Sequence, residues 1–156
     1  MFFFDLRTRK VCFAGMTRHP NDRFMVKAVR SAFSFLEGKR FLILDRDTKF
    51  SKCFRDTLPD GLQLLRTPFQ APNANAHAER FIRSIKDECL NRMIWFGDGP
   101  LRKAIYEYFE HYHIERNHQG IGNELIEDMG ASPKGGRVVS RERLGGTLRF
   151  YKRVAA

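Results

Sequence analysis

The sequence predicts an α/β fold with a mixed sheet. Apolar runs of strand length alternate with segments in which apolar residues recur every three or four positions, and a pair of apolar runs precedes this alternation. The 156 residues fit one compact domain. Hydrophobic residues make up 42% of the chain and include 15 Phe, which is enough for a buried core.

The first part of the chain predicts a hairpin, a helix and a strand. Residues 2–6 and 10–15 are apolar runs around a polar turn, which is typical of a β-hairpin. Asn21 can cap the following helix, which ends at Gly38. Residues 40–44 form a continuous apolar run, which we expect to be an interior strand. The apolar stripe predicted for the helix consists of Phe24, Ala28, Val29, Ala32, Phe33 and Leu36.

The middle of the chain predicts two further short elements and two longer helices. A helix over 51–58 ends at the turn 59–61, and a strand over 62–66 follows. After a Pro- and Asn-rich loop, a helix covers residue 76 to about residue 93. The next helix covers residue 100 to about residue 116, and its predicted apolar side consists of Leu101, Ile105, Tyr108, Phe109 and Tyr112.

The end of the chain is basic and rich in Gly. Residues 137–141 and 147–153 can form a hairpin across Gly145 and Gly146. We therefore predict two parts, a core over residues 1–128 and a basic tail over residues 129–156.

Charge favours a polyanionic partner. The chain has 28 Lys and Arg against 18 Asp and Glu, a net charge of +10 and a pI near 10.0. Nucleic acid is the first candidate partner and an anionic membrane the second, while the alternative is a solvated basic surface. The sequence contains neither an apolar stretch of about 20 residues nor a secretory signal. We therefore expect a cytoplasmic protein without a membrane partner.

The three cysteines do not predict a structural site. Cys12, Cys53 and Cys89 are odd in number and widely separated. Their spacing indicates neither a disulfide framework nor a zinc site.

Two acidic residues are candidates for metal chemistry. Asp45 follows the apolar run directly, at the strand end where ligand sites of α/β sheets gather. Glu79 lies one turn into a helix. Mg²⁺ and Mn²⁺ take oxygen ligands of this kind, and a pair of such ions supports phosphodiester chemistry. The alternative is that Asp45 belongs to a turn and that Glu79 faces solvent.

The helix that carries Glu79 also carries two cations on the same face. Glu79, Arg83 and Lys86 are spaced so that they lie together on one side of a helix. One carboxylate followed by two cations suits a site for metal and phosphate. The alternative is an ordinary surface ion-pair ladder.

Three segments together resemble DDE-type integrases and transposases, the family of retroviral-type integrases and bacterial insertion-sequence transposases. Residues 44–50 (LDRDTKF) resemble the motif of the second acid, and residues 72–86 (PNANAHAERFIRSIK) resemble the helix of the third acid. Residues 112–120 (YHIERNHQG) resemble the segment that follows in bacterial members. The resemblance covers residues 1 to about 128.

The resemblance implies a ribonuclease H-like fold, in which helices flank a mixed sheet, and DNA strand transfer with two Mg²⁺ or Mn²⁺ ions. It assigns Asp45 and Glu79 as catalytic metal ligands. Arg83, Lys86 and Asn75 become DNA contacts, with Asn75 on the loop beside the active site. The expected partners are DNA and further copies of the chain, without a small-molecule cofactor, in a bacterial cytoplasm and on the nucleoid when DNA is bound.

The first acid of the family pattern has no match. In the family it lies on a strand before the hairpin, whereas this chain starts at the hairpin. We expect the core to lack this central strand and the chain to be inactive or impaired. Asp5 is the one early candidate, and we assign it to the shape of the turn, like Asp47 further on.

Three functions remain open at this point. The leading one is a metal-dependent polynucleotidyl transferase core. A hydrolytic nuclease of the same fold would use the same acids with a different attacking hydroxyl. A non-catalytic DNA-binding or interaction remnant of a mobile element would use only the basic surface.

Overall fold

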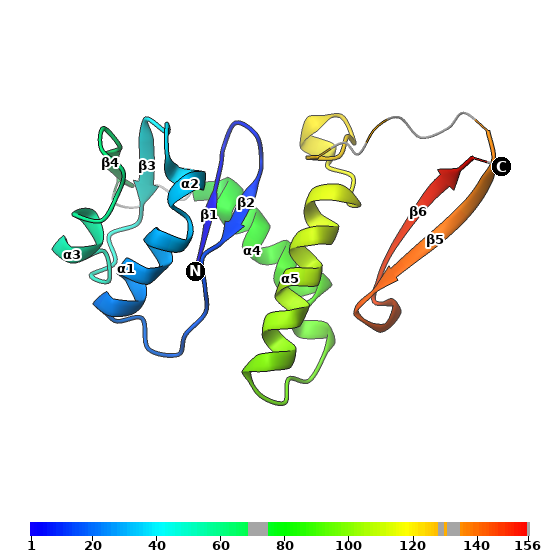
Figure 1. The fold of residues 1–156 in the computed structure, drawn as a ribbon, viewed down its shortest axis with the longest axis horizontal. Helices are drawn as coiled ribbons and strands as arrows, with labels where there is room; N and C mark the ends of the chain where they lie inside the picture. The colour runs from blue at the N-terminus through cyan, green and yellow to red at the C-terminus, as the bar shows by residue number, and fades with distance from the viewer. Residues whose placement is uncertain (69–74, 128–129, 131–134, 156) are drawn as a thin grey trace. The chain divides into compact units, whose positions relative to one another are not determined.

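The computed structural model describes residues 1–68, 75–127, 130 and 135–155. Helices alternate with short strands along the chain, as the sequence predicts (Figure 1). The chain divides into two compact units. Unit 1 consists of Met1–Asp5 and Val11–Glu79, and unit 2 consists of Leu6–Lys10 and Arg80–Ala156.

Unit 1 begins with the predicted hairpin strands. Strand β1 (Phe2–Phe4) pairs antiparallel with β2 (Val11–Phe13), and Phe3 lies opposite Cys12. Helix α1 (Asp22–Ser31) follows, and the side chain of Asn21 caps it by accepting a hydrogen bond from the Phe24 N–H at 3.0 Å. The predicted cap is confirmed.

The predicted single helix is interrupted at Ala32. The residue leaves helical geometry, with φ −108° and ψ 13°, and the short helix α2 (Phe33–Leu36) continues after it. The buried stripe centres on Met25, Ala28, Val29, Ala32 and Leu36. Phe33 lies at the edge of this stripe and is 42% exposed, so its predicted burial is wrong, while Met25 takes the central place.

Strands β3 (Phe41–Leu44) and β4 (Gln63–Arg66) pair in parallel, with Leu42 opposite Leu64. Between them lies α3 (Lys52–Arg55), which Ser51 caps through a 3.4 Å bond from the Phe54 N–H. The prediction of an interior strand is wrong for β3, because Phe41 is 48% and Ile43 is 36% exposed. Among the described residues β3 pairs only with β4. Side chains of a strand alternate between its two faces, so Leu42 and Leu44 face the core while Phe41 and Ile43 face solvent.

One apolar core holds unit 1 together. It is formed by the hairpin, α1, α2, β3 and α3, and Phe54 of α3 is fully buried in it. Its buried members are Phe3, Ala14, Met25, Ala28, Val29, Ala32, Leu36, Leu44 and Phe54.

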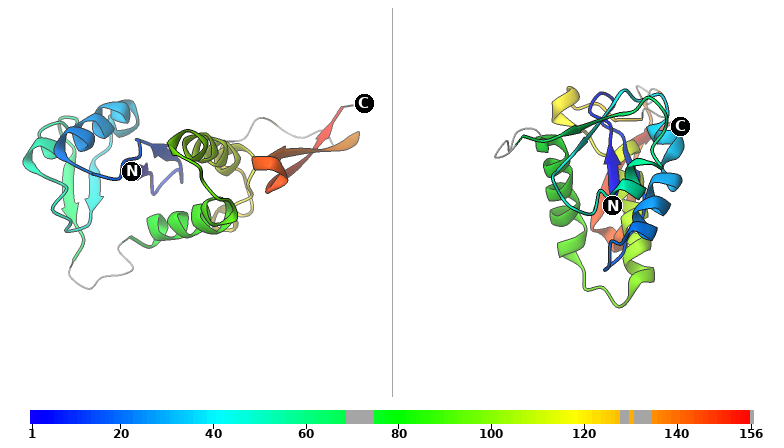
Figure 2. Two further views of the ribbon diagram at one scale, coloured as in Figure 1. Left: turned by 90° about the horizontal axis from the view of Figure 1, so that it is seen from below. Right: turned by 90° about the vertical axis from the view of Figure 1, so that its left-hand side faces the viewer.

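Unit 2 is built on two helices that lie side by side (Figure 2). Helix α4 (Ala76–Glu88) begins in unit 1 and ends before Cys89, earlier than predicted, where a short 3₁₀ turn (Leu90–Arg92) replaces it. Helix α5 (Asp98–Ile114) buries Tyr108, Phe109 and Tyr112, as predicted. Phe81 of α4 packs edge-on against Phe109 and Tyr112, with ring centroids 5.4 and 4.9 Å apart.

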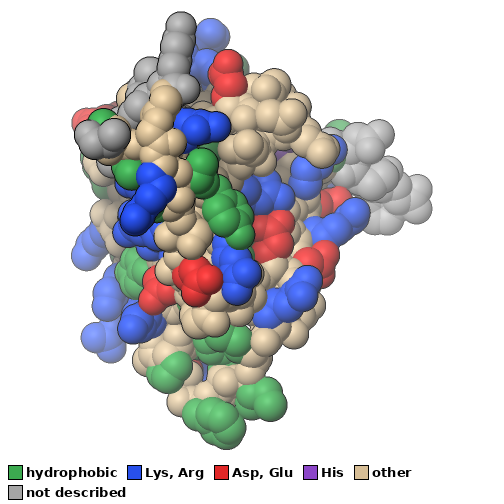
Figure 3. All heavy atoms as spheres, turned by 90° about the vertical axis from the view of Figure 1, so that its right-hand side faces the viewer, with side chains coloured by type: hydrophobic (Ala, Val, Ile, Leu, Met, Phe, Trp, Pro, Cys, Tyr) green, Lys and Arg blue, Asp and Glu red, His purple; other side chains and the backbone are tan. Residues whose placement is uncertain are grey.

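A hairpin closes unit 2, and its prediction is confirmed. Strands β5 (Arg137–Arg143) and β6 (Leu148–Val154) pair antiparallel across a 3₁₀ turn (Leu144–Gly146). Leu144, Gly145 and Gly146 all have positive φ, which the two glycines adopt without the strain of a side chain. In the view of Figure 3, Lys and Arg side chains are scattered over the surface among Asp and Glu side chains.

The α/β class is confirmed, whereas a single mixed sheet is not seen. The described residues form three separate two-stranded sheets, β1–β2, β3–β4 and β5–β6. Within the same residues, no helix combines the length and apolar character that crossing a membrane requires.

Candidate functional site

Asp45 lies in an exposed loop directly after β3. Its Oδ1 accepts a hydrogen bond from the Asp47 N–H at 3.2 Å. Asp47 in turn accepts from the Lys49 N–H at 2.9 Å and from Lys49 Nζ at 2.6 Å. These bonds from Lys49 hold the pKa of Asp47 below its usual value. Asp47 therefore shapes the turn, as predicted. The second carboxylate oxygen of Asp45, Oδ2, forms no hydrogen bond with a described residue.

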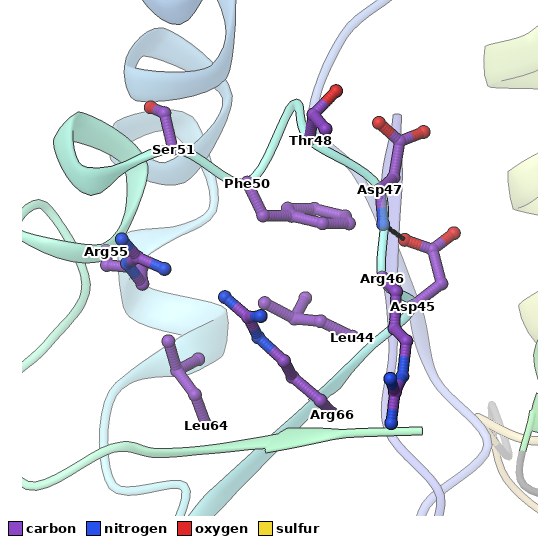
Figure 4. Close-up of a pocket in the computed structure, with 10 residues that line it drawn as sticks. All are labelled: Leu44, Asp45, Arg46, Asp47, Thr48, Phe50, Ser51, Arg55, Leu64 and Arg66. Atoms are coloured by element: carbon purple, nitrogen blue, oxygen red, sulfur yellow. Dashed lines mark hydrogen bonds between the residues drawn. The ribbon is translucent and has the colours of Figure 1, made fainter. Parts of the chain in front are cut away.

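The same loop borders a pocket of about 290 Å³ in unit 1. Figure 4 shows the guanidinium groups of Arg55 and Arg66 directed into it, beside the ring of Phe50. The carboxylates of Asp45 and Asp47 project on the other side of the loop. The pocket is lined by Leu44, Asp45, Arg46, Asp47, Thr48, Phe50, Ser51, Arg55, Leu64 and Arg66.

Glu79 and Asn75 are both exposed at the start of α4. Their side chains are accessible to a ligand, like that of Asp45. Part of the preceding loop, residues 69–74, lies outside the described residues. In the described part of the chain, no group of three or more His, Cys, Asp or Glu residues is arranged to hold a metal ion. A site shared by Asp45 and Glu79 stays a prediction.

Arg83 and Lys86 lie on the outer side of α4. Both are exposed, whereas Phe81 and Ile85 of the same helix are buried. Neither cation forms an ion pair with any residue that the structure describes. The ion-pair ladder that was the alternative for this face is thus not formed, and both charges face solvent.

Asp5 has a structural partner. Its side chain is only 8% exposed and forms an ion pair with Lys39 Nζ. A carboxylate buried in this way is held by its cation, which supports the assignment of Asp5 to a structural role rather than to a metal.

The segment 112–120 contributes to a partly buried polar network that the sequence did not reveal. Arg116 donates two hydrogen bonds to the Glu88 carboxylate, at 2.8 and 3.1 Å. The Tyr108 hydroxyl donates to the same carboxylate at 3.3 Å. Burial and the nearby charge of Glu88 raise the pKa of Tyr108 far above its usual value. These residues join α4 to α5 and have a structural role.

Three histidines lie near the end of α5, namely His111, His113 and His118. His118 is buried and its Nε2 lies 2.7 Å from the Tyr112 carbonyl oxygen. His111 is buried and contacts the Glu115 carboxylate at 3.1 Å. Burial lowers the pKa of His118 and also that of His113. All three therefore belong to the packing of unit 2.

Glu115 anchors the terminal hairpin. Its side chain is 3% exposed and accepts two hydrogen bonds from Arg143, both at 2.8 Å. Arg143 itself is 11% exposed. No spacing rule links these two positions, because one ends a helix and the other ends a strand.

Residues 60–124 match a family model described as "Integrase core domain". The match includes β4, α4 and α5, and therefore Glu79, Arg83 and Lys86, whereas Asp45 lies before it. It supports the DDE-type integrase or transposase catalytic core that the three motifs resemble. No curated protein and no solved structure matches the chain.

Proposed function

We propose that this chain, which carries an integrase core domain over residues 60–124, is the catalytic-core part of a DDE recombinase. Its reaction is metal-dependent strand transfer between DNA phosphodiesters, on a ribonuclease H-like fold. The family match across the Glu79 helix is the observation that carries this proposal. The loop after β3 supports it, because it supplies Asp45 from a strand end.

The donor chemistry of the two acids fits a hard divalent cation. Asp45 and Glu79 offer exposed carboxylate oxygens, the ligand type that Mg²⁺ and Mn²⁺ prefer. Asp45 and Glu79 are the residues that would hold such an ion, and a bound ion would supply activation of the attacking hydroxyl and stabilisation of the leaving oxygen. The hydrogen bond from the Asp47 N–H orients the Asp45 carboxylate and leaves its second oxygen available for such an ion.

The cations of α4 bind the substrate in this proposal. Arg83 and Lys86 are exposed, carry no ion pair to a described residue and belong to the same helix. We propose that they hold DNA phosphates beyond the metal site, with Asn75 contacting the strand beside it. Phosphate contacts position DNA without reading its sequence, so binding is nonspecific and weakens with salt.

Asp5 is not available as a further metal ligand, because Lys39 already pairs with its nearly buried carboxylate. A second candidate function is a DNA-binding module without catalysis. The exposed cations Arg83 and Lys86 favour it, because they could hold DNA without a metal site.

Metal binding tests the proposal independently of turnover. Mn²⁺ affinity is measured by calorimetry for the unchanged chain, for Asp45→Asn and for Glu79→Gln. Asp60→Asn serves as the control, because Asp60 is an exposed turn residue and Asn is equally suited to a turn. We expect both site variants to lose Mn²⁺ binding and the control to keep it. Equal affinity in all four proteins would exclude the metal site and leave the DNA-binding module.

The products formed on DNA separate the two chemistries. In Mn²⁺, with labelled donor and target duplexes, joined strands indicate a transferase and cut, unjoined strands indicate a nuclease. Loss of either product in Asp45→Asn, with retention in Asp60→Asn, assigns the chemistry to the proposed site.

Self-association of the chain is the remaining expectation. Analytical ultracentrifugation with and without DNA measures it.

A further inference from the structure

Two guanidinium groups face the same space without a counter-charge. Arg55 comes from α3 and Arg66 from the end of β4, and both point into the pocket after β3 (Figure 4). Neither side chain forms a hydrogen bond or ion pair with any residue in the described part of the chain. Like charges held in one pocket repel each other, so this arrangement favours an anion between them.

The acids of the pocket do not fill this role. In Figure 4 the carboxylates of Asp45 and Asp47 project away from the two guanidinium groups. Asp47 is moreover bonded to Lys49 through both its oxygens. The third arginine of the lining, Arg46, donates from Nε to the Thr67 carbonyl oxygen at 3.2 Å and is turned elsewhere.

The pocket walls strengthen an anionic contact. Leu44 is buried, Leu64 and Phe50 are partly buried, and together they place apolar surface beside the two charges. An ion pair next to such a surface is screened less than one in open water. Both arginines remain exposed, so a polymer lying across the pocket can reach them without entering a closed cavity.

We infer that Arg55 and Arg66 form a phosphate-binding subsite that takes one phosphodiester group of a nucleic-acid backbone, next to the Asp45 loop. Two planar guanidinium groups can each present a fork of N–H donors to different oxygens of one phosphate. The inference rests on the proposed DNA substrate. It adds a contact in unit 1 to those proposed for Arg83 and Lys86 in unit 2.

A pair of double variants tests the subsite. Arg55→Gln/Arg66→Gln removes both pocket charges, and Arg23→Gln/Arg30→Gln removes two exposed charges of α1 in the same unit. The net charge changes equally, so long-range attraction to DNA falls equally in both. Dissociation constants for a short duplex are measured in EDTA over a range of NaCl concentrations. Circular dichroism verifies that each variant is folded.

The pocket variant should bind duplex about tenfold more weakly than the control variant at low salt, the loss expected for charged hydrogen bonds. The slope of log affinity against log salt concentration should be smaller in magnitude by about one for the pocket variant than for the control variant. This difference corresponds to one lost phosphate contact. Equal affinity and equal slope in the two variants would overturn the subsite.

Two further outcomes distinguish failure of the phosphate subsite from failure of the proposed DNA substrate. If the pocket variant loses binding of inorganic phosphate, followed by ³¹P line broadening, but matches the control on DNA, the site serves free phosphate and the backbone contact is wrong. If the unchanged chain does not bind DNA at all, the proposed function fails first. Because EDTA removes divalent ions, failure of the metal site leaves the result of this experiment unaffected.

Discussion

Replacing Glu115 with Gln should detach the terminal hairpin from α5. The carboxylate is 3% exposed and accepts two 2.8 Å bonds from Arg143, with His111 Nδ1 at 3.1 Å and Arg141 Nε at 3.4 Å. Gln keeps the shape and one acceptor oxygen but removes the charge. Arg143, which is 11% exposed, then stays nearly buried and keeps only the more distant carboxylate of Glu110, at 4.0 Å, as a counter-ion.

The magnitude follows from this burial. Removing one partner of a buried ion pair costs about 3–5 kcal/mol, because the other charge is left desolvated. Since Gln still accepts one hydrogen bond, we expect Glu115→Gln to lower the free energy of unfolding by about 2–3 kcal/mol. For a chain of this size, that corresponds to a fall in Tm of roughly 4–12 °C.

The hairpin contains its own control. Glu142 pairs with Arg149 at 3.1 Å, but both side chains are more than half exposed. Glu142→Gln should change stability by less than about 0.5 kcal/mol, as exposed pairs contribute little. Urea unfolding and limited proteolysis after β5 measure both variants. If Glu115→Gln is as stable and as protease-resistant as Glu142→Gln, the anchoring role of Glu115 is wrong.

The pH dependence gives a second readout of the same contact. Burial alone would raise the pKa of Glu115, but hydrogen bonds from Arg143 and His111 outweigh it and hold the pKa below its usual value. A carboxyl whose pKa is lowered on folding stabilises the protein above its unfolded pKa, about 4.3, and loses this effect as the pH falls through the folded value. The stability difference between the unchanged chain and Glu115→Gln should therefore shrink below about pH 4.

Three further predictions concern the packing of the two units. Phe54→Ala should cost about 3–5 kcal/mol in urea unfolding, because Phe54 is fully buried, whereas Phe96→Ala should cost little because Phe96 is 84% exposed; similar losses would contradict the assigned core. Asn21→Ala should cost about 1 kcal/mol and Asn21→Gly only a few tenths, because Asn21 caps α1; equal losses would argue against the cap. Burial and the charge of Glu107 raise the pKa of Cys89 to about 11, so iodoacetamide at pH 8 should label exposed Cys53 well before Cys89. Mass spectrometry of the labelled peptides measures the order, and labelling of Cys89 first would contradict this prediction.

Local signals in the sequence predicted most of the elements. The hairpin β1–β2, the cap at Asn21, the turn at Gly61 and the hairpin β5–β6 each depend on residues close together in the chain. Strand β3 shows the limit of such signals. Its continuous apolar run is typical of an interior strand. The number of strands that pair with β3 depends on how the whole sheet is assembled, which a local run of residues does not encode.

The candidate site divides in the same way. Asp45, Glu79, Arg83 and Lys86 belong to contiguous motifs, so the sequence could nominate them. Arg55 lies on α3 and Arg66 lies on β4. The sequence could not link them, because they meet at one pocket only when β4 pairs in parallel with β3 and α3 connects the two strands. The Glu115–Arg143 pair likewise depends on how a hairpin docks on a helix.

The net charge of +10 conceals two kinds of cation. Lys39, Arg116 and Arg143 pair with acids that are partly or fully shielded from solvent, so they stabilise the fold and are unavailable to a ligand. Arg55, Arg66, Arg83 and Lys86 are exposed and form no ion pair with a described residue. A DNA phosphate competes only with water for this second kind, whereas it would have to break a protein ion pair to reach the first. The cations that a phosphate could reach are therefore those of the second kind, which include these four side chains and also Arg23 and Arg30 of α1.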